Sequence, residues 1–209
     1  MTMLPAMAHA IVPSDHESAP PLHQPEPVAY SAYLAAEAAS PIKHEYLAGR
    51  TWAMAGGTPE HAAICANLIT ALSLALRGKP CRVFTSDMRL RIPDCRMATY
   101  PDVTVICGPA EPAADDRHAA VNPVLLVEVL SDSSEAYDRG EKAAMYRRIP
   151  SLQEYLLVAQ TSARVERYRR CPGEVWELSE AGPGGAIELA SLAVTLDVSG
   201  IYYDPLAHA

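Results

Sequence analysis

Two short apolar segments, residues 103–106 and 124–130, constrain the fold of this chain more than any other feature. Both are rich in β-branched and aliphatic side chains, a composition typical of strands that are buried on both faces. Each segment also carries an acid, because Asp102 directly precedes the first and Glu128 lies inside the second. An ionised carboxylate in a buried strand destabilises the fold unless it is paired, protonated or bound to a cation. The sequence therefore predicts a compensating group beside each of these acids.

The remaining pattern mixes strands with a few helices. Apolar residues at helical spacing predict helices at residues 30–39, 59–75 and 137–149, each followed within a few residues by proline. Further strands are expected at residues 44–47, 50–54, 82–85, 88–92, 154–158, 163–169, 174–178 and 187–189. Residues 108–122 are rich in glycine, proline and acids, and are expected to form a loop. This order predicts an α/β fold in which a mixed α+β sheet carries flanking helices.

The chain divides into two parts by composition. Residues 1–28 hold six prolines among polar side chains, and proline at this density opposes both helix and sheet. We expect this segment to be a disordered tail and residues 29–209 to form a single folded domain. No stretch approaches the roughly 20 apolar residues that a membrane-spanning helix needs. The N-terminus also lacks the basic region of a secretory signal, so a cytoplasmic protein without a membrane partner is expected.

Net charge restricts the ways in which this protein can approach a polyanion. The formal charge is −8 at neutral pH. A protein that coats nucleic acid through its own charge is usually basic, so this class is disfavoured. An enzyme that reaches phosphate through bound cations remains compatible with the charge, because the metal supplies the positive charge.

The five cysteines predict no covalent framework. Their number is odd, their spacings are long, and no CxxC motif occurs. We therefore expect buried, reduced thiols rather than disulfides or a zinc knuckle.

The two strand acids belong to a larger constellation. Asp102 and Glu128 lie on consecutive strands, which often pair, and a divalent cation such as Mg²⁺ would relieve the repulsion between them. On the following helix, Asp138, Lys142 and Tyr146 recur at steps of four residues and so share one face. A lysine that points from this face toward Glu128 could hold or deprotonate a water at that cation.

Several short motifs together make this sequence resemble the Uma2 family (DUF820) of restriction-endonuclease-like proteins. They are Pro101-Asp102, Glu128-Val129-Leu130-Ser131, Asp138 with Lys142 and Tyr146, the run from Pro150 to Tyr155, and the upstream pair Glu45 and His61. The similarity spans roughly residues 30 to 200. It implies a restriction endonuclease-like core of the PD-(D/E)XK nuclease superfamily.

The resemblance also implies roles for individual residues. Asp102 matches the aspartate of the nuclease motif, and Glu128 matches its second acid. The usual lysine position, two residues later, holds Leu130, and Lys142 on the helix matches the displaced lysine. Glu45 matches an additional acid near the metal. The implied metal ligands are therefore Asp102, Glu128 and Glu45.

Two further positions qualify this match. His61 opens the helix after the first hairpin and is implied to contact phosphate or a ligand carboxylate. Relatives often carry an acid after the strand that contains Glu154 and Tyr155, whereas this chain has Ala159-Gln160 there. That departure affects the similarity only locally.

The implied activity is hydrolysis of phosphodiester bonds in nucleic acid, with DNA as the expected substrate and Mg²⁺ (or Mn²⁺) as cofactor. Homodimerisation is expected by analogy with restriction-type enzymes. Two other functions stay open, because fold does not fix function. The first is a nucleic-acid-binding or interaction module that has the nuclease fold but no activity. The second is a phosphodiesterase acting on small molecules.

Each site residue also has a simpler structural explanation. Asp102 could cap a turn, Glu128 could pair with a structural arginine, and Lys142 could form a surface pair with Asp138. His61 could merely pack, and Glu45 could be a solvated hairpin charge. A basic run near the C-terminus has two interpretations as well: a phosphate-contacting surface or charges that protect a strand edge. The run consists of Arg164, Arg167, Arg169 and Arg170.

Overall fold

The computed structural model describes residues 26–54, 56–131 and 134–206. Most of the predicted N-terminal tail, residues 1–25, lies outside the described residues. Within the described ranges, no helix has both the length and the apolar character needed to cross a membrane.

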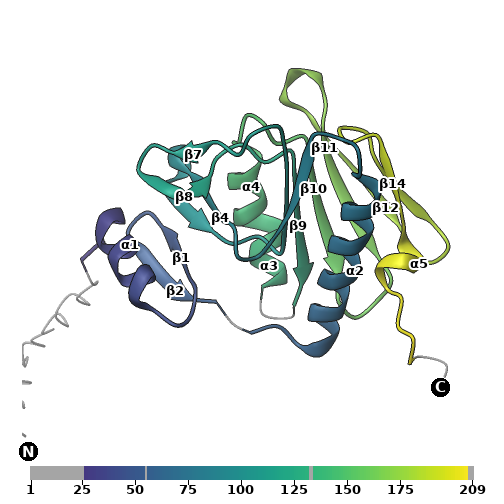
Figure 1. Cartoon of the computed structure of the whole chain (residues 1–209), viewed down its shortest axis with the longest axis horizontal. Coiled ribbons are helices and arrows are strands. Elements are labelled where there is room, and N and C mark those ends of the chain that lie inside the picture. The colour runs from purple at the N-terminus through teal and green to yellow at the C-terminus, as the bar shows by residue number, and fades with distance from the viewer. Residues whose placement is uncertain (1–25, 55, 132–133, 207–209) are drawn as a thin grey trace, which may run out of the picture.

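The central element is a six-stranded sheet with the order β12-β11-β10-β9-β6-β3 (Figure 1). Its middle strands β9 and β10 run parallel, and its other neighbours are antiparallel. The strand bounds are β3 Cys81–Thr85, β6 Val103–Cys107, β9 Leu125–Leu130, β10 Glu154–Ala159, β11 Val165–Arg170 and β12 Trp176–Ala181. The two apolar segments with acids are thus the neighbours β6 and β9, as predicted.

A second six-stranded sheet, with the order β2-β1-β5-β4-β8-β7, lies beside the first. Its strands are β1 His44–Leu47, β2 Arg50–Ala53, β4 Arg89–Ile92, β5 Met97–Thr99, β7 Pro112–Ala113 and β8 Asp116–Ala120. A separate antiparallel pair is formed by β13 Ala186–Leu189 and β14 Val194–Asp197. The mixed α/β class is therefore confirmed, although the strands divide into separate sheets rather than one.

The helices are α1 Tyr30–Ala39, α2 Pro59–Ala75, α3 Glu135–Tyr137, a π-helix Asp138–Lys142, α4 Ala143–Tyr146 and α5 Val198–Ile201, with short 3₁₀ turns at Pro93–Cys95 and Pro172–Glu174. Helices α2 and α4 pack against the central sheet, whereas α1 packs against the second sheet. The side chain of Thr58 caps α2 by accepting a hydrogen bond from the backbone N–H of His61 at 3.2 Å. Proline at the first helical position adds to this start signal. The cap fixes His61 in the first turn of α2.

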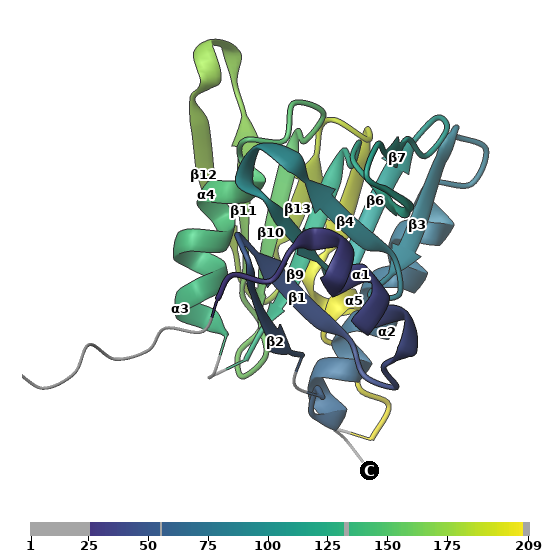
Figure 2. The ribbon, with the colours of Figure 1, turned by 90° about the vertical axis from the view of Figure 1, so that its left-hand side faces the viewer.

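Alternating side chains of β9 enter two different cores. Leu125, Val127 and Val129 pack with α2, whereas Leu126 and Leu130 pack with α4. Figure 2 shows α2 and the α3–α4 segment on different sides of the central sheet. Glu128 lies between Leu126 and Leu130 in the alternation, so strand geometry turns its carboxylate toward α3 and α4.

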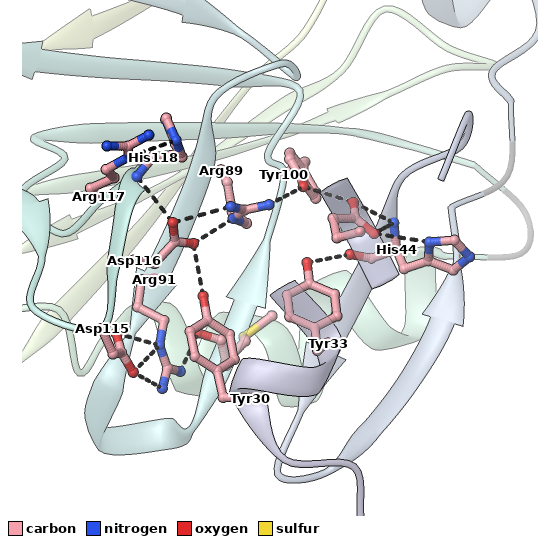
Figure 3. A network of polar contacts seen from close by, with 12 residues as sticks. Tyr30, Tyr33, His44, Arg89, Arg91, Tyr100, Asp115, Asp116, Arg117 and His118 are labelled. Atoms are coloured by element: carbon pink, nitrogen blue, oxygen red, sulfur yellow. Dashed lines mark hydrogen bonds and ion pairs between the residues drawn. The ribbon is translucent and has the colours of Figure 1, made fainter. Parts of the chain in front are cut away.

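A polar network ties α1 to the second sheet (Figure 3). The Tyr30 hydroxyl donates to Asp116 Oδ2 at 3.0 Å, and the Arg89 guanidinium donates to both oxygens of Asp116. Arg89 also donates to the Tyr100 hydroxyl at 2.9 Å, which in turn donates to Glu37 Oε1 at 2.8 Å. The Glu37 carboxylate accepts the first backbone N–H of β1, so the network fixes this strand relative to α1.

Several predicted elements need correction. Residues 108–122 are not simply a loop, because β7 and β8 form there and β8 pairs in parallel with β4. The predicted helix 137–149 is a composite that ends at Tyr146 and contains a π-helical turn. Strands β5 and β14 and helix α5 were not predicted.

The expectation of reduced thiols was wrong for two cysteines. Cys81 and Cys107 form a disulfide, with their Cα atoms 3.9 Å apart. They are paired residues in the antiparallel register of β3 and β6, which brings together positions that are distant in sequence. The cysteines at 65, 95 and 171 are free thiols.

Candidate functional site

A cavity of about 680 Å³ opens beside the ends of β6 and β9. Its walls include the β1–β2 hairpin, the start of α2 and the π-helix. The five residues singled out from the sequence all line it: Glu45, His61, Asp102, Glu128 and Lys142. The structure thus brings these residues together, and their roles stay predictions.

Lys142 is the centre of a buried ion cluster. Its ammonium lies 2.9 Å from Glu128 Oε1, 3.2 Å from Glu45 Oε1 and 3.3 Å from Asp138 Oδ1. The Tyr146 hydroxyl donates a hydrogen bond to the same Glu128 oxygen at 2.7 Å. Lys142 is only 6% exposed. Its pair with Asp138 therefore exists but is buried and shared, unlike the surface pair that was the simpler explanation.

The π-helix determines where Lys142 points. Residues 138–142 form this wider turn between α3 and α4, and such turns occur often at functional sites. The Tyr155 hydroxyl of β10 donates to the backbone carbonyl of Asp138 at 3.2 Å. This bond fastens the start of the turn to the central sheet, on the face where Glu128 lies.

Glu45 is not a solvated hairpin charge. It is 5% exposed, and the Trp52 indole N–H donates to its Oε2 at 3.0 Å. The Thr99 hydroxyl donates to Oε1, the oxygen that also faces Lys142. Strands β1, β2 and β5 together hold this carboxylate at the cavity wall.

Asp102 lies at the start of β6, beside Glu128. Antiparallel pairing of Val103 with Val127 places residue 102 opposite residue 128 when the register continues. Asp102 Oδ2 accepts the backbone N–H of Val129 at 2.8 Å and lies 3.2 Å from His61 Nε2. The aspartate is therefore fixed by a strand and a helix at once.

Two neighbouring side chains shift the protonation equilibrium of His61. The hydrogen bond to Asp102 is the largest cause, with the Cys65 contact second, and together they raise the pKa of His61 to about 10. The imidazole is therefore protonated at neutral pH. An imidazolium at this position is a cation at the rim of an acidic cavity.

The cluster as a whole carries excess negative charge. Four carboxylates, those of Glu45, Asp102, Glu128 and Asp138, face two cationic side chains, Lys142 and His61. Burial raises the pKa of Glu128, and the nearby carboxylates of Asp102 and Asp138 add to this effect. Together they outweigh the ion pair with Lys142 and bring the pKa to about 8. Burial also raises the pKa of Asp138. Such shifts mark a place where a further positive charge would be stabilised.

Several residues of the site were missed in the sequence. Thr99 and Trp52 contact Glu45 through strand pairing and leave no signal in sequence spacing. Cys65 did leave one, because it follows His61 by four residues on a helix and so shares its face. Gln160 lines the cavity, and its amide oxygen has no hydrogen-bond partner among the described residues.

The side chains of the basic run, which spans residues 164–170 at and within β11, contact other parts of the fold. Arg164 pairs with Glu166, and Arg169 pairs with Glu177 at the strand edge. Arg167 donates to the backbone carbonyl of Glu188, and Arg170 donates to the backbone carbonyls of residues 147, 149 and 152. These contacts favour the structural interpretation of the run over a phosphate-binding surface.

Comparison with known proteins places the chain in a family. The profile of the Uma2 family, described as "Putative restriction endonuclease", matches residues 30–199. Two relatives come from Synechocystis sp., the "Uncharacterized protein slr1290" and the "Uncharacterized protein sll1609". The first is 36% identical over 170 residues, which cover 81% of this chain and 88% of the relative. The second is 36% identical over 163 residues, which cover 78% of this chain and 92% of the relative.

A solved structure shares the fold. It is the crystal structure from Anabaena variabilis of "a putative nuclease belonging to DUF820", with a TM-score of 0.67 and 17% sequence identity. The similarity covers 84% of this chain and 98% of that one. The match of the family profile over residues 30–199 establishes that this chain belongs to the Uma2 family.

Proposed function

We propose that this protein is a metal-dependent endonuclease that hydrolyses phosphodiester bonds in nucleic acid, with DNA as the expected substrate. The observation that carries the proposal is the buried cluster around Lys142, in which carboxylates outnumber cations. Phosphodiester cleavage needs groups that offset the charge developing on phosphate. Family membership supports this reaction class.

The donor set fits a hard divalent cation. Asp102, Glu128 and Glu45 offer carboxylate oxygens, which Mg²⁺ and Mn²⁺ prefer as ligands. The contacts described above engage Glu128 through Oε1 and Asp102 through Oδ2. A cation bound by these residues would lower the pKa of water and offset the charge that develops on the phosphate.

The side chains of the chain itself position the reactants. Lys142 forms ion pairs with three carboxylates, and these contacts fix the position of its ammonium group before substrate binds. From there it orients the attacking water or stabilises the anionic transition state. His61, protonated at neutral pH and lining the cavity, would contact a phosphate oxygen of the substrate.

The direct test is cleavage of supercoiled plasmid DNA with Mg²⁺ or Mn²⁺. We expect nicked or linear product from the unmodified protein, and a loss of at least about a hundredfold in Asp102→Asn and Glu128→Gln. Glu60→Gln is the matched control, because Glu60 is an exposed acid in the first turn of α2 and should leave the rate unchanged.

Two outcomes would redirect the assignment. Binding of DNA that survives both substitutions, without cleavage by any form, would indicate a nucleic-acid-binding or interaction module. Hydrolysis of a chromogenic phosphodiester with none of DNA would indicate a small-molecule phosphodiesterase. A homodimer remains a prediction from the sequence and can be measured by light scattering on the same samples.

A further inference from the structure

A second set of metal-ligand atoms lies on the α2 side of the cavity. The ligand atoms of His61, Cys65 and Asp102 all lie within 4.8 Å of one another. Cys65 Sγ is 3.6 Å from His61 Nδ1, and His61 Nε2 is 3.2 Å from Asp102 Oδ2. This set combines a thiol, an imidazole and a carboxylate, whereas the cluster around Lys142 has only oxygen ligands to offer.

We propose that His61, Cys65 and Asp102 bind a thiophilic divalent cation, with Zn²⁺ as the expected ion. Sulfur and imidazole nitrogen select zinc over magnesium, which strongly prefers oxygen. The four-residue spacing of His61 and Cys65 places both ligands on one face of α2, next to the start of β6. The inference does not depend on nuclease activity.

A tetrahedral ion needs one ligand atom from each of the three residues. Metal–ligand bonds of about 2.0–2.3 Å place neighbouring ligand atoms roughly 3.3–3.8 Å apart. The ligand atoms of His61, Cys65 and Asp102, one from each residue, lie within 4.8 Å of one another. Cys65 and Asp102 contact different nitrogens of His61, so binding through a single nitrogen requires the imidazole to turn and these separations to shorten to this range. On binding, the Cys65 thiol and the His61 imidazolium each release one proton to solvent, and one imidazole nitrogen then binds the ion.

An ion has access to this set. The side chains of His61 and Asp102 are 18% and 16% exposed, and both line the cavity. Three protein ligands leave a fourth coordination position, which water fills from the cavity side. Gly57 leaves the imidazole its space, because a Cβ atom there would lie 2.7 Å from His61 Nδ1.

Cobalt is the probe for this site, because a thiolate bound to Co²⁺ gives a charge-transfer absorption in the near ultraviolet. The background is Cys81→Ser/Cys107→Ser, so that a reduced disulfide supplies no thiols. We expect the absorption in this background and in Cys95→Ser made on it. We expect its loss in Cys65→Ser, together with a fall in Zn²⁺ affinity of at least about tenfold.

The proposal is overturned if no thiolate absorption forms, or if it persists unchanged in Cys65→Ser. Circular dichroism reports whether each variant is folded. A second measurement needs no substitution: Zn²⁺ should protect Cys65, but not Cys95 or Cys171, from alkylation detected by mass spectrometry. Equal alkylation of Cys65 with and without Zn²⁺ would also refute the site. No nucleic acid enters either measurement, so the outcome is independent of the nuclease assignment.

Discussion

Lys142 Nζ lies 2.9 Å from Glu128 Oε1, in a buried ion pair that joins the π-helix to the middle of the central sheet. The lysine also balances Glu45 and Asp138, so one cation stabilises three carboxylates. Removing one partner from a buried ion pair leaves an uncompensated charge, which costs far more than the loss of a surface pair. Stability and the proposed chemistry therefore depend on the same lysine.

Lys142→Met should destabilise the protein by about 3–5 kcal/mol, because it leaves three carboxylates buried without their cation. The measurement is urea unfolding without divalent metal at pH 9, above the pKa of about 8 at which Glu128 ionises. Lys43→Met is the matched control, since Lys43 pairs with the exposed Asp87 and its loss should cost at most about 1 kcal/mol. Equal losses of unfolding free energy in the two variants would mean that Lys142 does not stabilise the buried carboxylates around it.

The raised pKa of Glu128 makes stability depend on pH. The folded state holds the Glu128 proton more tightly than the unfolded chain, whose pKa is near 4.5. The stabilisation from that proton is present at low pH and is lost as pH rises toward the folded value of about 8. In metal-free protein, the Tm of Glu128→Gln relative to the unmodified protein should therefore increase between pH 5 and pH 8. A difference that stays constant over this range would contradict the shift.

Divalent cations should stabilise the folded state. A ligand that binds only the folded protein at a hundred times its Kd adds about 2.7 kcal/mol. We expect Mg²⁺ or Mn²⁺ to raise Tm, EDTA to reverse the rise, and Asp102→Asn to abolish it. Glu60→Gln should respond like the unmodified protein. An equal response in Asp102→Asn would show that the cation binds elsewhere.

Gly57→Ala should weaken binding of Co²⁺ and Zn²⁺ at the proposed thiophilic site. The added Cβ would lie 2.7 Å from His61 Nδ1, so the imidazole has to move. Gly56→Ala is a close control, because a Cβ at that position meets nothing within 4 Å. Cobalt titration followed by absorption compares the two variants. Identical affinities would argue against His61 as a ligand.

Zinc should inhibit DNA cleavage if both proposals hold, because Asp102 belongs to both ligand sets. Excess Mg²⁺ should relieve the inhibition, and Cys65→Ser should weaken it while preserving the rate without zinc. Cleavage assays over a range of Zn²⁺ concentrations measure both effects. Inhibition of equal strength in Cys65→Ser would place the inhibitory ion away from Cys65.

Local patterns in the sequence predicted much of the fold. The helices at residues 30–39 and 59–75 agree with the structure, because spacing and capping signals are local. Pairing of β6 with β9 followed from two consecutive apolar runs. The strand β8 was missed because its stability comes from pairing with β4, a contact between residues far apart in the sequence.

The site was predictable in part for the same reason. Acids within apolar strands are anomalous in any context, so Asp102 and Glu128 could be found from the residues alone. The partners of Glu45 could not, since Thr99 and Trp52 reach it only through strand pairing. The disulfide was hidden likewise, because Cys81 and Cys107 are 26 residues apart and meet only through the register of β3 and β6.

Alternation along β9 has a consequence for folding fidelity. A slip of one residue in its pairing would turn Glu128 toward the aliphatic side chains of α2 and away from Lys142. A lone charge among those side chains would cost several kcal/mol, so misaligned pairing is strongly disfavoured. Glu128 therefore favours the correct register of β9 during folding, whatever reaction the folded protein carries out.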